Sequence, residues 1–186
     1  MKPNKAAMPE VSVVVAVGNV EESIGRGLRR IVEHLRGLGR SFEVLAVNEG
    51  SWDTSFTVLR LLASEMPELR LLPCDVGGRA FLRGTSEARG LEVVLADGAN
   101  LGASLAPLGW ALSRLSLGKE AVVVRGRWIA ARRLPALPAI ARTRGRWEIF
   151  ERGFERHAQD LALEVVGTPR RQSGGLLAPV FRFLAI

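Results

Sequence analysis

Polar residues follow strand-like apolar runs at four places in the chain, and their types and spacing suit a ligand site. At residues 48–51 the sequence Asn-Glu-Gly-Ser ends one such run and leads into a helix-like pattern, as nucleotide-binding loops do in α/β proteins. The other three segments are residues 18–19, 75–78 and 97–100. Because parallel strands bring their carboxyl ends to one edge of a sheet, we expect all four segments to contribute to a single site.

Glycine and arginine residues add a second kind of chemistry, the binding of phosphate. The backbone N–H groups of Gly77 and Gly78 could approach a phosphate at the start of a helix, although a simple tight turn also explains this pair. The late loop that contains Arg170 and Arg171 could contact phosphate without a metal, because guanidinium groups bind oxyanions in a bidentate manner. A loop that merely lies in solvent explains these two arginines equally well.

Other kinds of site find no support in the sequence. It contains no Ser-His-Asp set, zinc-ligand pattern, Walker loop or aromatic RNA-binding motif. His34 and His157 have no Cys or His partner at metal-ligand spacing, which favours structural or solvent-facing roles for both. The arginines alone are too little to predict nucleic-acid binding, so no nucleic-acid partner is expected.

The elements that must position these residues alternate between strand and helix for about two thirds of the chain. This alternation predicts an α/β protein with three layers, in which helices cover both faces of a mostly parallel central sheet. After Arg125 the alternation loosens, and we expect a helical packing layer, a helix at 148–160 and a late strand at 161–166 that joins the sheet. The earlier strands are predicted at residues 11–17, 42–47, 69–72, 92–96 and 121–124.

Length and composition favour one domain. A chain of 186 residues, of which 47% are hydrophobic, can bury one sizeable core, so we expect a flexible amino terminus at 1–10 and a single domain at 11–186. Cys74 is the lone cysteine, and the first ten residues lack the apolar core of a signal peptide, which together favour the cytoplasm. The apolar run at 11–17 is far shorter than the roughly 20 residues that span a bilayer.

The net charge of +7 lies wholly in the last third of the chain. Residues 125–186 contain twelve arginines and five acidic residues, whereas cationic and acidic residues balance over 1–124. Such an excess indicates a partner that carries phosphates, an anionic lipid surface or an acidic protein. A solvated, arginine-rich helix surface accounts for the same charge without any partner. The protein is therefore expected either free in the cytoplasm or peripherally at a membrane.

In their order along the chain, these segments resemble the sequence blocks of the family-2 glycosyltransferases with the GT-A fold, particularly the polyprenol-phosphate sugar transferase branch. The family's second block, Val-Asp-Asp-Gly-Ser-x-Asp-x-Thr, corresponds to residues 47–55. Further blocks correspond to residues 75–80, 87–100 and 163–174. The first block, Pro-Val-Tyr-Asn followed by glutamates, is matched at Val17, Asn19, Glu21, Glu22, Ser23 and Ile24.

This resemblance covers nearly all of residues 11–175 and implies a GT-A fold that binds a nucleotide-diphospho-sugar, linked to UDP or GDP. It implies a nucleotide-binding half at 11–124, whose first two blocks hold the base and the ribose, and an acceptor-side half at 125–186. In the family, an Asp-x-Asp block holds a divalent cation that neutralises the diphosphate. The residues implied at the nucleotide are Ala16, Val17, Gly18, Asn19, Glu21, Asn48, Glu49, Ser51, Gly77, Arg79 and Asp97.

The sequence departs from the family pattern in two places. The Asp-x-Asp block is Asp97-Gly98-Ala99, so Asp97 is the one carboxylate left to bind Mg²⁺ or Mn²⁺, and it would be a weak metal ligand. The acceptor-side half is short and has no Asp or Glu between Ala121 and Glu148, where a catalytic base is expected. We therefore assign no catalytic residue and no required cofactor from the sequence.

Three hypotheses follow for function. In the first, the protein is a glycosyltransferase that works with little or no metal, with arginines in place of the cation. In the second, it keeps the fold as a binding or regulatory module without transfer activity. In the third, it is an interaction subunit whose basic carboxyl-terminal third docks on a membrane surface or an acidic protein.

Overall fold

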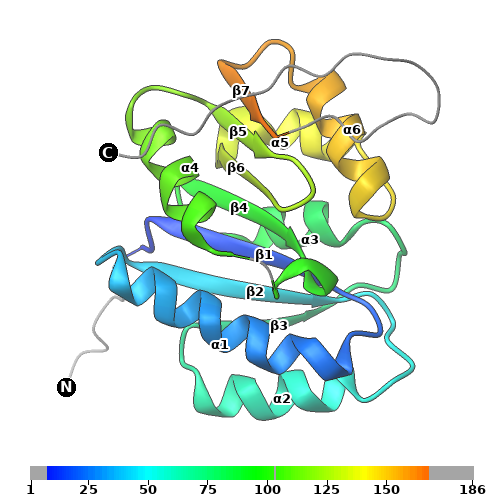
Figure 1. Cartoon of the computed structure of the whole chain (residues 1–186). Coiled ribbons are helices and arrows are strands. Elements are labelled where there is room, and N and C mark those ends of the chain that lie inside the picture. The colour runs from blue at the N-terminus through cyan, green and yellow to red at the C-terminus, as the bar shows by residue number, and fades with distance from the viewer. Residues whose placement is uncertain (1–7, 103, 168–186) are drawn as a thin grey trace.

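The computed structural model describes residues 8–102 and 104–167, which form seven strands, six α-helices and one short 3₁₀ helix (Figure 1). The strands are β1 Val11–Val17, β2 Phe42–Asn48, β3 Leu69–Pro73, β4 Glu92–Asp97, β5 Ala121–Val124, β6 Trp128–Arg132 and β7 Leu163–Val166. The helices are α1 Glu21–Gly37, α2 Ser55–Glu65, α3 Ala80–Glu87, η1 Gly98–Asn100, α4 Ala106–Ser116, α5 Arg133–Arg142 and α6 Trp147–His157.

All seven strands join one sheet in the order β3-β2-β1-β4-β6-β5-β7. The pairs β1–β2, β2–β3, β1–β4 and β5–β7 are parallel, whereas β6 runs antiparallel to both β4 and β5. The chain builds outward from β1 to β3 and then crosses to β4 on the other side of β1. The strand order therefore reverses between β1 and β4, which is where open α/β sheets form their ligand crevice.

Helices cover both faces of the sheet. The strand β1 is buried along its whole length, as its continuous run VSVVVAV predicts for a strand covered on both sides. Its Val13 and Val15 side chains join the core beneath α1, α2 and α4, while Val14 and Ala16 join the core beneath α3, α5 and α6. This arrangement confirms the predicted three-layer α/β class with a mostly parallel sheet.

The segment after β5 differs from the expectation. Instead of a helical packing layer alone, residues 128–132 form β6, an interior strand between β4 and β5, before the chain enters α5. The run Trp-Ile-Ala-Ala is too short for its period to distinguish a strand from a buried helix. Within the described residues, no helix combines the length and hydropathy that crossing a bilayer requires. Arg170, Arg171 and most of the predicted flexible amino terminus lie outside the described residues.

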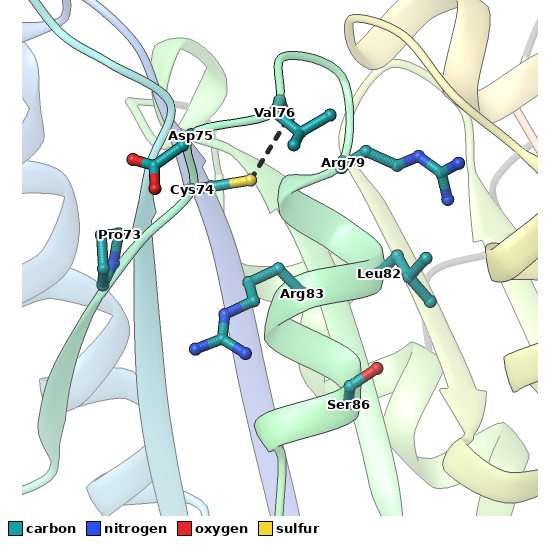
Figure 2. Close-up of a pocket in the computed structure, with 8 residues that line it drawn as sticks. All are labelled: Pro73, Cys74, Asp75, Val76, Arg79, Leu82, Arg83 and Ser86. Carbon is teal, nitrogen blue, oxygen red and sulfur yellow. Dashed lines mark hydrogen bonds between the residues drawn. The ribbon is translucent and has the colours of Figure 1, made fainter.

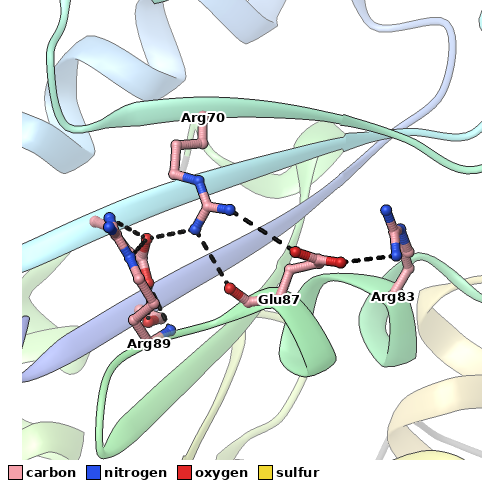
Figure 3. Close-up of polar contacts among 6 residues, drawn as sticks. Arg70, Arg83, Glu87 and Arg89 are labelled. Atoms are coloured by element: carbon pink, nitrogen blue, oxygen red, sulfur yellow. Dashed lines mark hydrogen bonds and ion pairs between the residues drawn. The ribbon is translucent and has the colours of Figure 1, made fainter. Parts of the chain in front are cut away.

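A buried carboxylate, that of Glu43 at the start of β2, connects the strands at the edge of the sheet opposite their carboxyl ends. Figure 3 shows Arg70, Glu87 and Arg89 in this region. The Glu43 carboxylate accepts hydrogen bonds from the Ser12 hydroxyl at 2.8 Å, the Arg89 backbone N–H at 2.7 Å and Arg70 at 2.9 Å. Arg70 also reaches Glu87 of α3. These contacts link three adjacent strands to the connection between α3 and β4, and so fix the frame that positions the opposite edge.

Candidate functional site

The structure brings the four predicted segments together at the carboxyl edge of the sheet. Val17 at the end of β1 is in register with Asn48 of β2, and Ala16 is in register with Asp97 of β4. Asn48 is in turn in register with Pro73 at the end of β3. The loops after these four strands therefore start side by side across the point where the strand order reverses (Figure 1).

Hydrogen bonds join the loop after β1 to the loop after β2. Asn19 has a backbone φ of 54°, and its side-chain oxygen accepts from the Trp52 N–H at 2.9 Å. Its own N–H donates to the Ser51 hydroxyl at 3.3 Å. The Glu21 carboxylate accepts from the Thr54 N–H at 2.7 Å and from the Thr54 hydroxyl. Two of the predicted nucleotide residues thus hold the neighbouring loop in position.

Two further residues, Ser55 and Asp53, complete this connection. The hydroxyl of Ser55, fully buried, accepts from the Val20 N–H at 2.9 Å, and Asp53 accepts from the Glu21 N–H at 3.2 Å. Hydrogen bonds to its carboxylate hold the pKa of Asp53 below its ordinary value, although desolvation acts in the opposite direction. We call the set Asn19, Glu21, Ser51, Trp52, Asp53, Thr54 and Ser55 the β1–β2 clasp.

Asn48, which ends β2, and Glu49, which follows it, have distinct partners. The Asn48 side-chain oxygen accepts from the Ser51 hydroxyl at 2.6 Å, which shapes the turn after β2. Glu49 bonds to a more distant element. Its carboxylate accepts a hydrogen bond at 3.2 Å from the N–H of Ala80, which is the first residue of α3. A carboxylate at this end of a helix is stabilised by the helix dipole. Glu49 therefore occupies the position where a phosphate could otherwise approach the start of α3.

Asp97 ends β4 and lies partly buried at the centre of this edge. Burial raises the pKa of its carboxyl group above the ordinary value, and the nearby charge of Glu148 raises it further, while the Ala99 N–H at 3.0 Å opposes both. Glu148 belongs to the first turn of α6, so this helix contributes a second carboxylate to the edge. The sequence offered no sign of this pairing, because the two residues lie far apart in the chain.

The residues present do not fit the divalent cation that the resemblance implies. Among residues 8–102 and 104–167, no three His, Cys, Asp or Glu side chains are grouped so that they could hold a metal ion. The undescribed residues 1–7, 103 and 168–186 contain none of these four residue types. Mg²⁺ and Mn²⁺ favour several hard oxygen ligands. The described side chains therefore supply too few ligands to hold such a cation by themselves.

An open groove of about 590 Å³ lies beside this edge, between the end of β3 and the outer face of α3. Pro73, Cys74, Arg79 and Arg83 are among its lining residues, and the Cys74 thiol donates to the Val76 carbonyl at 3.3 Å. Figure 2 shows the Arg79 and Arg83 side chains extending from α3 in opposite directions. Of the predicted nucleotide residues, only Arg79 lines this groove, so the groove adjoins the strand ends without covering them.

The loop after β3 also contacts the loop between α5 and α6. The Gly145 N–H donates to the Gly78 carbonyl at 3.2 Å, and a Cβ on Gly78 would lie 2.8 Å from the Gly145 nitrogen. Gly78 has a φ of 71°, a left-handed conformation that glycine adopts without strain. This contact brings Arg144 and Arg146, on either side of Gly145, to the same edge as Arg79. Sequence reasoning missed both arginines and had only the basic composition of the segment as a signal.

No protein-family model matches the chain, and no curated protein matches it in sequence. Solved structures do resemble it. A mannosyltransferase from Pyrobaculum calidifontis, in complex with GDP-Man and Mn²⁺, aligns with a TM-score of 0.66 and 19% identity over 89% of this chain. TarS 1–349 from S. aureus, in complex with UDP-GlcNAc, gives a TM-score of 0.64 and 13% identity over 89% of the chain.

This chain has the GT-A glycosyltransferase fold. A further structure with this fold, glucosyl-3-phosphoglycerate synthase from M. tuberculosis with Mn²⁺, UDP and phosphoglyceric acid, has a TM-score of 0.63 and 20% identity over 84% of the chain. The chain spans 59% of the mannosyltransferase, 60% of TarS 1–349 and 68% of the synthase. At these identities the GT-A fold is what the chain shares with them.

Proposed function

We propose that this chain is a glycosyltransferase-like protein that binds a nucleotide-diphospho-sugar at the carboxyl edge of its sheet. One observation carries the proposal. The loops after β1, β2, β3 and β4 meet beside the reversal of strand order, in a fold shared with structures that contain GDP-Man, UDP or UDP-GlcNAc. Under this proposal, the loops after β1 and β2 hold the nucleoside, and Arg79 and Asp97 lie near the diphosphate.

Transfer of the sugar would need a group that removes the proton of the acceptor hydroxyl. Glu148 is the candidate for this role, because its charge acts on Asp97 and it lies in the first turn of a helix that borders the edge. A second candidate function is binding without transfer. It is favoured because, among residues 8–102 and 104–167, no three His, Cys, Asp or Glu side chains are grouped so that they could hold a metal ion to assist departure of the nucleoside diphosphate.

Calorimetric titration of the full chain with UDP, GDP and their sugar conjugates tests whether a nucleotide binds. We expect at least one of these ligands to bind with a dissociation constant in the range typical of enzyme substrates, about 1 μM to 1 mM. The titrations are run in excess EDTA and again with Mn²⁺. If none of the nucleotides binds under either condition, the proposal is wrong.

A matched pair of variants locates the bound nucleotide. Gly18 is exposed after β1, and a Cβ there would meet no atom within 4 Å, so Gly18→Leu should fold normally and fill space at the edge. We expect it to weaken nucleotide binding by about tenfold or more. Gly37→Leu is the control, because Gly37 is equally open but lies at the far end of α1. Equal affinity of the two variants would place the nucleotide elsewhere.

Release of nucleotide from the bound donor separates transfer from binding alone. If the chain is a transferase, we expect slow release of UDP or GDP above the uncatalysed rate, and loss of this release in Glu148→Gln with donor affinity retained. If both the wild type and Glu148→Gln bind the donor but neither releases measurable UDP or GDP, the result would support the binding module and exclude Glu148 as a base.

A further inference from the structure

Three arginines lie next to the backbone contact between the loop after β3 and the loop between α5 and α6. Arg79 directly precedes α3, and Arg144 and Arg146 flank Gly145, whose N–H donates to Gly78 at 3.2 Å. Arg144 and Arg146 are exposed and Arg79 is half-buried. We call Arg79, Arg144 and Arg146 the arginine triad. Because Gly78 and Gly145 are in contact, the side chains of the triad start from neighbouring points of the backbone.

The arginine triad lacks acidic partners within the part of the chain that the structure describes. Some arginines elsewhere are paired, as in Arg36 with Glu68 at 2.7 Å and Arg125 with Glu155 at 2.8 Å. Others on exposed helix faces, such as Arg26, Arg60 and Arg156, are like the triad in forming no ion pair with a described residue. None of the ion pairs formed by the described residues includes a member of the triad. Three guanidinium groups that start from two touching loops concentrate positive charge, which a bound anion would offset.

Two of these arginines also stand at helix starts, where the helix dipole disfavours positive charge. Arg79 is the residue immediately before α3, and Arg146 is the residue immediately before α6. The start of a helix carries partial positive charge, which favours anions and disfavours cations. At α3 the Glu49 carboxylate already accepts from the Ala80 N–H at 3.2 Å, and an anion between the two loops would offset the remaining positive charge of the arginines. Guanidinium groups suit the oxygen atoms of phosphate, to which they can donate two parallel hydrogen bonds.

The arginine triad lies at the same edge as Asp97, where the cation and diphosphate were expected. Glu148, whose charge acts on Asp97, follows Arg146 by two residues in the first turn of α6. The carboxylates at this edge do not form a metal-binding group, as described above. Positive charge is thus supplied at this edge by arginine side chains.

We propose that the arginine triad binds the diphosphate of the donor nucleotide in place of a divalent cation, so that nucleotide binding needs no metal. This inference rests on the proposed function, because it names the groups that hold the phosphates of the proposed ligand. It differs from the metal-dependent arrangement that the resemblance implies. Loss of each guanidinium contact should weaken binding by about tenfold or more, as for other hydrogen bonds to charged groups.

The test is calorimetric titration of the full chain with UDP and with GDP, in excess EDTA and in Mn²⁺. The variants are the triple substitution Arg79→Gln, Arg144→Gln and Arg146→Gln, and a control that replaces the exposed Arg26, Arg60 and Arg156 by Gln. Both triples remove the same charge. We expect metal-independent binding in the wild type and the control, and about 100-fold or greater loss in the triad variant.

The outcomes separate this inference from the proposed function. Binding that requires Mn²⁺, or that survives in the triad variant, would overturn the inference and leave the proposed function standing. Absence of binding by the wild type in every buffer would overturn both. Thermal melting checks that the variants fold. If replacing the half-buried Arg79 unfolds the chain, the double variant of the exposed Arg144 and Arg146 decides by the same criteria.

Discussion

Glu43 is a buried residue whose carboxylate has several hydrogen-bond partners. It is 2% exposed, and its carboxylate accepts hydrogen bonds from Ser12, Arg70 and Arg89. Burial alone would raise its pKa, but the Arg89 N–H and the two guanidinium groups hold the pKa below its ordinary value of 4.5. Ionisation of Glu43, relative to the protonated form, is therefore more favourable in the folded chain than in the unfolded chain.

Glu43→Gln should lower the free energy of unfolding by about 2 to 4 kcal/mol at neutral pH, because two arginines lose their charged partner. The stabilisation by Glu43 is fully present above pH 4.5 and is lost as the pH falls through the lowered pKa. The difference between wild type and variant should therefore shrink in acid. Urea unfolding at a series of pH values measures it, and a difference that stays constant down to acid pH would contradict the assigned charge.

At the residue scale, the sequence indicated which residues follow the strands at the carboxyl edge of the sheet, but not which residues they contact. Asn19, Glu21, Asn48 and Glu49 were identifiable by type and by their place after apolar runs. Their partners were not, because these bonds mostly join residues more than 30 positions apart, as Glu49 and Ala80 are. The link between Asp97 and Glu148 was hidden for the same reason.

At the scale of elements, α3 illustrates how packing fixes the edge. It lies against β1 and β2 through Gly84, and a Cβ on Gly84 would lie 2.2 Å from Val14 and 3.1 Å from Val47. A larger residue would push the helix away from the sheet. The start of the same helix carries Arg79 and receives the Glu49 carboxylate, so its placement controls both.

Gly84→Ala should therefore destabilise the chain by about 1 to 3 kcal/mol through overpacking. Gly25→Ala in α1 is the matched control, because its Cβ would meet Val58 at an ordinary 3.5 Å. Alanine at that helical position should stabilise by about 0.5 to 1 kcal/mol. Chemical denaturation of both variants measures the two effects, and a shift of the same sign in both would refute the packing argument.

Of the strands in the described residues, β6 is the one that the sequence did not predict. The strands β1 and β2 each have a nearly continuous apolar run of a length typical of buried strands. By contrast, β6 is a run of four apolar residues that is followed by arginine and by the helix former Leu134. This pattern is compatible with a strand and with a helix. Its antiparallel pairing with β4 depends on a contact that no local pattern records.

At the scale of the whole molecule, the sheet is unevenly supported. The strand β1 has neighbours on both sides and helices on both faces, and it is buried throughout. The strand β7 has four residues and pairs with β5 alone among the described strands, and none of its residues is fully buried. The sheet contains strands from residues 11–124 and from residues 125–167, and we expect its stability to fall from β1 towards β7.

Hydrogen exchange should reflect this gradient. We expect the backbone amides of β1 and β4 to exchange only by global unfolding, and those of β7 to exchange faster by a factor on the order of 100 or more. Mass spectrometry of peptides covering each strand measures the rates. Equal protection of β1 and β7 would mean that the sheet opens as one cooperative unit.

The β1–β2 clasp has a thermodynamic consequence for any ligand that binds at the edge. The loops after β1 and β2 are already ordered by bonds such as Asn19 to Trp52 and Glu21 to Thr54, so their conformational entropy is lost during folding. A ligand then meets a rigid surface, and its binding entropy carries little cost from ordering these loops. Discrimination between nucleotides would then depend on the preorganised shape of these loops, and not on closure of the loops around the ligand.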